Sequence, residues 1–246
     1  MRAVQRIIAI LESFTPEKSS LTLQEIADHI GLAKSTTFRI VQSLQRAGYL
    51  VRLQDQRYCL SFRLTRLAGL VNSTLSIREI ARPITTQLAD DTKETVSIQT
   101  VSGRNRVCID AIATSTSPLR NVTQPGEHIS LAAGASSKTL AAFLPKKTVA
   151  PIVAQMARAA RCDQAAVMEE LSKIRKRGYA VSHGERILGV SAVCAPIKGV
   201  DDQVNYCLSV AGPSIRMQAK EKEIIRLVVK AAADISRQYG ANMEHS

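Results

Sequence analysis

The 246-residue sequence lacks any apolar run that approaches the roughly 18 residues of a membrane span. Its first residues also lack the apolar stretch and small-residue cleavage site of a secretory signal. Its five cysteines form no Cys-x-x-Cys pair, which argues against a zinc site and a disulfide framework. The four histidines are scattered along the chain. We therefore expect a cytoplasmic protein with reduced thiols, no cofactor and no metal site.

Motifs of covalent catalysis are also missing. No Gly-x-Ser-x-Gly is present, and no nucleophile motif surrounds any cysteine. A cysteine hydrolase would need a nucleophile and a base side by side, for which His128 and His183 are available. The alternative of an enzyme therefore predicts turnover of an ester or amide that is lost in Cys194→Ala. We expect no enzyme and no catalytic residues.

The charge is strongly one-sided. Lysine and arginine number 33 against 21 aspartates and glutamates, which gives a net charge of +12. Such a surplus favours an anionic partner, of which nucleic acid is the commonest, although a basic enzyme is the alternative on charge alone. The length, with 45% hydrophobic residues, suffices for two domains of ordinary size.

The first third of the sequence carries three short helical patterns. Apolar residues at helical spacing predict a first helix over residues 4–11. Thr22 and Glu25 form a capping box, which opens a second helix that ends at Gly31. A third helix is expected from residue 34 to about residue 47. Two short helices joined by a glycine-containing turn are typical of a helix-turn-helix.

A hairpin pattern follows the third helix. Two β-prone runs, residues 49–53 and 57–61, surround a polar tip and predict the wing of a winged helix. Helical spacing then returns over residues 62 to about 71, and residues 72–74 break it, so we expect a linker helix within residues 62–74. These patterns assign residues 1–61 to a winged helix-turn-helix domain and residues 75–246 to a second domain.

The second domain mixes helices with antiparallel strand pairs, which predicts an α+β class. Asp163 and Gly178 are the expected cap and stop of one of its helices. Residues 114–133 are expected to be mostly loop. The other expected elements are helices over 76–91, 134–144 and 217–239, and strands over 95–101, 106–113, 188–197 and 204–211.

The third helix of the first domain has an apolar and a polar face. Phe38, Val41 and Leu44 are expected to pack inward, with Ile40 beside them. The polar face and the hairpin supply the candidate DNA-binding residues Lys34, Ser35, Thr36, Thr37, Arg39, Gln42, Ser43 and Arg57.

Each of these residue types has a counterpart on DNA. Arg39 can reach guanine, and Gln42 can pair with adenine. Ser35 and Thr36 lie near the helix N-terminus, where phosphate binds, and Lys34, Arg52 and Arg57 add charge contacts to the backbone. The alternatives are a solvated polar face, or a winged helix that binds only protein or RNA.

Two strands of the second domain have faces of unequal bulk. Ala192 and Cys194 share one face of their strand, and Cys207, Ser209 and Ala211 share one face of the next. The opposite faces carry larger side chains, namely Val193, Ile197, Leu208 and Val210. A face of small residues leaves room for a ligand, or for a closely packed helix. Cys108, Cys194 and Cys207 are interpreted as small core residues, with a redox sensor as the alternative.

Segments along nearly the whole chain, in order, resemble the IclR family of bacterial transcriptional regulators. The similar segments are residues 21–27, 31–39, 44–50, 80–83, 133–144, 174–179, 189–196 and 209–213. The resemblance implies a GAF-like effector-binding and oligomerisation domain over 75–246, and a homodimer or dimer of dimers. It also implies binding to a double-stranded DNA operator, modulated by a small metabolite, with repression the commoner outcome, and no catalysis.

The resemblance further implies an effector site. It places the site around Ala135, Ser136, Ser182, Ala192, Ser209 and Ala211, and we add Cys194 and Cys207 from the same strand faces. Family members that bind small oxo-acids have an acidic residue where Ser182 stands, cysteine where Ala192 stands and serine where Ala211 stands. The usual histidine near Ala132 is also absent. We hypothesise an aromatic or other catabolic organic acid as effector, with a small oxo-acid pathway or a protein-interaction module as alternatives.

Overall fold

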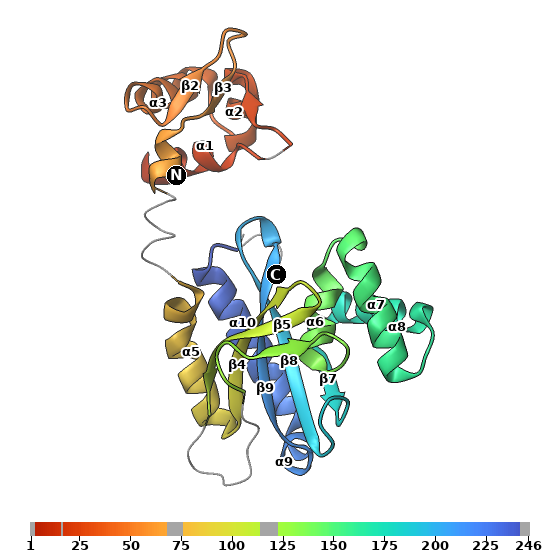
Figure 1. Cartoon of the computed structure of the whole chain (residues 1–246). Helices are drawn as coiled ribbons and strands as arrows, with labels where there is room; N and C mark the ends of the chain where they lie inside the picture. The colour runs from red at the N-terminus through yellow and green to blue at the C-terminus, as the bar shows by residue number, and fades with distance from the viewer. Residues whose placement is uncertain (1–2, 16, 68–75, 114–122, 242–246) are drawn as a thin grey trace. The chain divides into compact units, whose positions relative to one another are not determined.

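The computed structural model describes residues 3–15, 17–67, 76–113 and 123–241 (Figure 1). The chain forms two compact units, Met1–Ser76 and Ile77–Ser246. Of the predicted linker helix, residues 63–67 are helical. The rest of that helix and the expected break at 72–74 lie outside the described residues.

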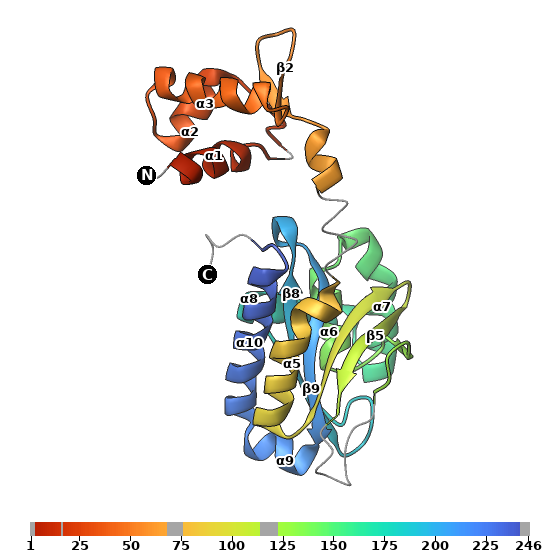
Figure 2. The same ribbon diagram turned by 90° about the vertical axis from the view of Figure 1, so that its left-hand side faces the viewer.

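The N-terminal unit contains the three predicted helices and the predicted hairpin, seen from a second side in Figure 2. The capping box is formed, because the Thr22 amide donates to Glu25 Oε2 (2.7 Å) and the Glu25 amide to Thr22 Oγ1 (3.2 Å). Gly31 ends the second helix with a φ of 65°, which favours glycine. The elements are α1 (Ala3–Glu12), β1 (Ser20–Leu21), α2 (Leu23–Ile30), α3 (Lys34–Arg46), β2 (Leu50–Arg52) and β3 (Tyr58–Leu60).

One predicted packing contact of α3 is wrong. Phe38 is 39% exposed, whereas Thr37 is fully buried beside Val41 and Leu44. Residues at 37, 41 and 44 follow the helical repeat, so the buried stripe takes threonine and leaves phenylalanine outside. The hairpin also gains β1, which pairs with β3 and was not predicted because two residues carry no periodic signal.

The C-terminal unit is built on a six-stranded sheet with the order β6-β5-β4-β9-β8-β7, in which every neighbouring pair is antiparallel. Both predicted strand pairs are confirmed, and with them the α+β class. Two short strands, β6 and β7, were not predicted. The strands are β4 (Thr95–Ser102), β5 (Asn105–Ile112), β6 (His128–Ser130), β7 (Ala180–His183), β8 (Val190–Lys198) and β9 (Val204–Pro213).

The helices of this unit agree with the predictions in part. Asp163 caps α8 through a bond from the Ala166 amide (2.7 Å), and Gly178 ends it, as expected. A helix containing Pro151, α7, was not predicted. The expected single final helix is in fact two, because the backbone at Lys220 leaves the helical region (φ −121°, ψ 20°). The helices are α5 (Ile77–Thr92), α6 (Ala135–Phe143), α7 (Lys146–Ala160), α8 (Gln164–Arg177), α9 (Ser214–Ala219) and α10 (Glu221–Gln238), with a 3₁₀ turn at Val200–Asp202.

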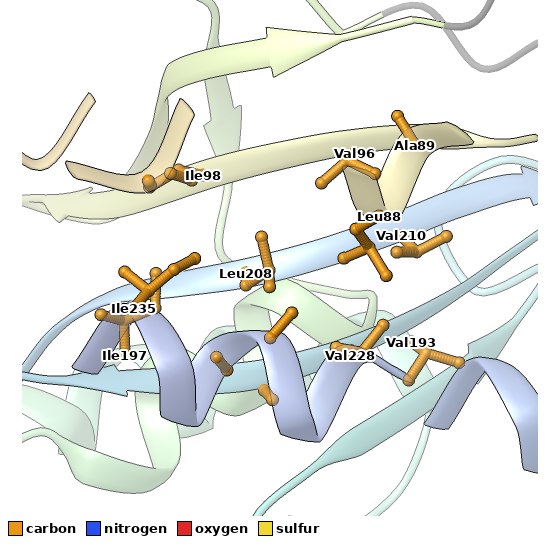
Figure 3. Close-up of a cluster of buried hydrophobic side chains, with 14 of the residues drawn as sticks. Leu88, Ala89, Val96, Ile98, Val193, Ile197, Leu208, Val210, Val228 and Ile235 are labelled. Atoms are coloured by element: carbon orange, nitrogen blue, oxygen red, sulfur yellow. The ribbon is translucent and has the colours of Figure 1, made fainter. Parts of the chain in front are cut away.

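The sheet is covered on both faces (Figures 1 and 2). Helices α5 and α10 pack on one face, where the larger side chains of β8 and β9 point, as predicted. Figure 3 shows Val193, Leu208 and Val210 meeting residues of these helices, such as Leu88 and Val228. Helix α6 packs on the other face, and α7 and α8 pack against α6. None of the described helices has the length and apolar composition needed to cross a bilayer.

An ion pair between the buried carboxylate of Glu94 and the partly exposed Arg216 fixes the junction between β9 and α9. Glu94 is 3% exposed, and Arg216 donates to both of its carboxylate oxygens (2.6 and 2.9 Å). A Cβ on Gly212 would lie 2.2 Å from Glu94 Oε2. Gly212 therefore provides the space in which this carboxylate lies.

We expect Gly212→Ala to lower the free energy of unfolding by about 1–3 kcal/mol, because the added methyl displaces the paired carboxylate. Urea denaturation measures the loss. In a Glu94→Ala background the clash partner is gone, so the same substitution should have a much smaller effect. Equal losses in both backgrounds would contradict the proposed clash.

Candidate functional sites

The N-terminus of α3 is open to a ligand. Its N-cap, Ala33, offers no side-chain acceptor, so the first amide groups of the helix are left uncapped. Lys34 and Ser35 are exposed there, and Thr36 is half-buried. A helix N-terminus with free amides and a lysine attracts phosphate groups.

The exposed face of α3 continues with side chains that can contact bases. Arg39 is exposed, and its guanidinium pairs with no other described side chain. Gln42 accepts a long bond from Arg46 (3.4 Å), and the Ser43 hydroxyl turns back to the Arg39 carbonyl (2.9 Å). Phe38 lies next to Arg39 and was missed as a candidate, although an exposed phenylalanine can contact a thymine methyl.

Two predicted DNA-binding residues are placed elsewhere. Thr37 is fully buried, and its hydroxyl donates to the Ala33 carbonyl (3.2 Å), so it cannot reach DNA. Arg57 donates to the Ser20 carbonyl (2.7 Å) and hydroxyl (3.1 Å) and pairs with Glu25 (3.1 Å). Hydrogen bonds from Thr22 and the charge of Arg57 lower the pKa of Glu25. Arg57 thus links β3 to β1 and α2, and its phosphate contact stays a prediction beside this structural role.

A second site lies on the small-residue face of the large sheet. A cavity of about 40 Å³ lies between the sheet and the start of α6. It brings together six predicted effector positions, Ala135, Ser136, Ser182, Ala192, Ser209 and Ala211. Cys194 and Cys207 do not line it, because they are fully buried in the core under α6, α7 and α8.

One buried charge that lines this cavity, that of Arg106, was not predicted from the sequence. Arg106 of β5 is 5% exposed and donates Nε to Ser137 Oγ (3.2 Å) and Nη1 to Gln99 Oε1. Burial lowers the pKa of Arg106, and the nearby Arg186, which also lines the cavity, acts in the same direction. The only sequence signal was the alternation of β5, which places Arg106 on the same face as Cys108. A bulge after Cys108 turns Asp110 to the opposite face, where Arg82 of α5 donates to it.

Three side chains outside the cavity resemble a hydrolase triad. Ser191 Oγ lies 3.1 Å from His183 Nδ1, and His183 Nε2 lies 3.1 Å from Glu221 Oε2. However, Ser191 is only 1% exposed, and its hydroxyl donates to Ser214 Oγ (2.8 Å). The hydroxyl is therefore neither accessible nor directed at the base, and we assign this group to the packing of β8 against α9.

Comparison with known proteins decides the family. Residues 3–54 match the model of the IclR helix-turn-helix domain, and residues 70–237 match that of the C-terminal part of the bacterial transcriptional regulator IclR. The chain belongs to the IclR family. Its N-terminal unit is the family's DNA-binding helix-turn-helix domain, and its C-terminal unit is the ligand-binding domain of an IclR regulator.

Relatives and solved structures agree with this family. The chain is 29% identical to the HTH-type transcriptional regulator KipR of Bacillus subtilis, over 97% of each chain. It matches a putative IclR regulator from Silicibacter sp. TM1040 with a TM-score of 0.82 and 24% identity, over 98% and 97% of the two chains. An IclR homologue from Microbacterium hydrocarbonoxydans, solved with 4-hydroxybenzoate, matches at a TM-score of 0.60 and 18% identity, over 96% and 98%.

Arg57 and Arg39 of the winged helix should respond differently to substitution. We expect Arg57→Met to lower the free energy of unfolding of the N-terminal unit by about 1 kcal/mol, through loss of the bonds to Ser20. Arg39→Met, the matched control, should leave stability unchanged because Arg39 has no described partner. Thermal unfolding followed by circular dichroism measures both. An unchanged midpoint in Arg57→Met would contradict its structural role.

The cysteines should differ sharply in reactivity. Burial raises the pKa of the Cys108 thiol to about 11, and Cys194 and Cys207 are fully buried. Cys162 is exposed and Cys59 half-buried. We expect iodoacetamide at pH 8 to modify Cys162 first and the three buried thiols only after unfolding, as read by mass spectrometry. Rapid modification of Cys194 in the folded protein would favour the redox-sensor alternative.

Proposed function

We propose that this IclR-family chain is a repressor that binds a palindromic DNA operator and changes its operator affinity when an organic acid binds the C-terminal unit. The observation that carries the proposal is the exposed face of α3. On this face the uncapped helix N-terminus can bind phosphate, and Gln42 and the unpaired Arg39 can contact bases. The net charge of +12 favours the same partner.

The proposed effector class is an aromatic or other organic acid of a catabolic pathway. The IclR homologue complexed with 4-hydroxybenzoate shows that an aromatic acid binds one protein of this fold. The cavity here is about 40 Å³, whereas a cavity that holds benzene measures about 150 Å³. An aromatic acid would therefore require the lining to move, and the volume favours a small acid as second candidate.

The proposal includes a homo-oligomer, a dimer or a dimer of dimers, in the cytoplasm. A two-fold protein predicts half-sites one or more helical turns apart on the DNA. The proposal assigns no catalytic step, since the triad-like group found among the described residues has a buried serine.

The first test is selection of duplex DNA from random sequence and from the upstream region of the chain's own gene. We expect a palindromic site, bound with an affinity that falls steeply with salt. Arg39→Met should reduce the preference for that site over a scrambled duplex by about 10–100-fold, the equivalent of roughly 1–3 kcal/mol. Fluorescence anisotropy measures both affinities.

Arg46→Met is the matched control, because it removes the same charge from the last turn of α3. It should weaken site and scrambled duplex alike. Failure to enrich any duplex sequence at moderate salt would overturn the DNA-binding proposal and favour a protein-interaction module.

A further inference from the structure

Arg106 is an exception among the buried charges of the C-terminal unit. The buried carboxylates of Glu94 and Asp110 each accept two bonds from an arginine, Arg216 and Arg82 respectively. Arg106 is buried to a similar extent, yet no described carboxylate lies within 4.0 Å of its guanidinium. The charge of Arg106 therefore lacks the counter-charge that the other two buried groups have.

A buried guanidinium without a carboxylate is costly to maintain. Arginine does not lose its proton in proteins, so the group cannot avoid the cost by becoming neutral. Its two partners, Ser137 and Gln99, are uncharged, and Nη2 donates to no described group. Gln99 is held in place by its own bond to Ser97 Oγ (2.8 Å). The guanidinium is thus fixed by neutral groups, with one edge left for a further acceptor.

The surroundings of Arg106 in the cavity are those of an anion site. No aspartate or glutamate is among the described lining residues, whereas Arg186 adds a second positive group. Hydroxyl groups that can donate hydrogen bonds are contributed by Ser97, Ser136, Ser182 and Ser209. Two acidic side chains lie nearby without lining the cavity. Glu185 is bound to Lys138 (2.6 Å) and to the Gly134 amide (3.1 Å), and Glu127, whose charge acts on Arg106 without an ion pair, accepts from the Gln124 amide (3.2 Å).

We propose that Arg106 binds the carboxylate of the effector, with the serine hydroxyls of the cavity as further donors. This inference rests on the proposed effector-regulated function and narrows it, because it requires the effector to carry a negative charge at the end that enters the cavity. Neutral analogues of the same shape, such as amides, should therefore fail to bind.

The test compares full-length wild type with Arg106→Gln. Thermal unfolding is followed with acetate, pyruvate and benzoate, and with the amides of the same three acids. Sodium bromide supplies an inorganic anion smaller than any of these acids, and the ionic strength is kept constant throughout. We expect wild type to be stabilised by at least one carboxylate and by no amide. Arg106→Gln should bind that carboxylate at least tenfold more weakly.

Two further variants control this experiment. Arg104→Gln removes the same charge from an exposed position of the same hairpin and should bind like wild type. Arg106→Lys keeps the charge but loses the two-pronged geometry, so it should retain part of the affinity. If Arg106→Gln fails to fold, the test uses Arg106→Lys and Arg186→Gln instead. Each of these variants should weaken binding of the carboxylate.

The outcomes are separable from those of the proposed function. Carboxylate affinity within twofold of wild type in Arg106→Gln, or equal binding of acids and amides, would overturn the inference. So would a wild type that no anion stabilises, bromide included. Operator binding of the same preparations, measured without added acid, tests the regulator itself and should be equal in wild type and Arg106→Gln.

Discussion

The pairing of β8 with β9 determines most of the C-terminal unit. In this register Val193 lies opposite Val210 and Cys194 opposite Ser209, so large side chains collect on one face and small ones on the other. The bulky face has enough apolar surface to hold α5 and α10. The small face accepts α6 closely over part of its area and leaves the cavity at the start of that helix. A shift by one residue would exchange the two faces and abolish both the core and the site.

Arginines illustrate how one residue type serves different purposes in this chain. Arg57 and Arg216 are bound by nearby carboxylates and hold elements together, whereas Arg39 on α3 and Arg106 on β5 lack such partners. An arginine whose charge is already matched by an internal carboxylate has little left to offer an anionic ligand. Arg39 and Arg106, which lack a carboxylate partner, lie in the two places where a ligand is proposed, a DNA base for Arg39 and a carboxylate for Arg106.

The local signals in the sequence were sufficient for most elements. The Thr22–Glu25 capping box and the stops at Gly31 and Gly178 depend on neighbouring residues alone, so they could be predicted. The alternation in β8 and β9 likewise predicted the two faces of the sheet. Elements without such a signal were missed: β1 and β7 are too short for a period, and Pro151 obscured α7. The break at Lys220 was missed because apolar spacing continues from α9 into α10.

The site residues show where prediction from sequence ends. Thr37 and Phe38 are neighbours, and which one is buried depends on the rotation of α3 against α1 and α2, which composition does not specify. The structural role of Arg57 was missed because Ser20 and Glu25 are distant from it in sequence. Arg106 gave no motif, since its meaning comes from the neutral groups that surround it after folding. A charge becomes evidence for a ligand only when its buried surroundings are known, because the same arginine in water would require no partner.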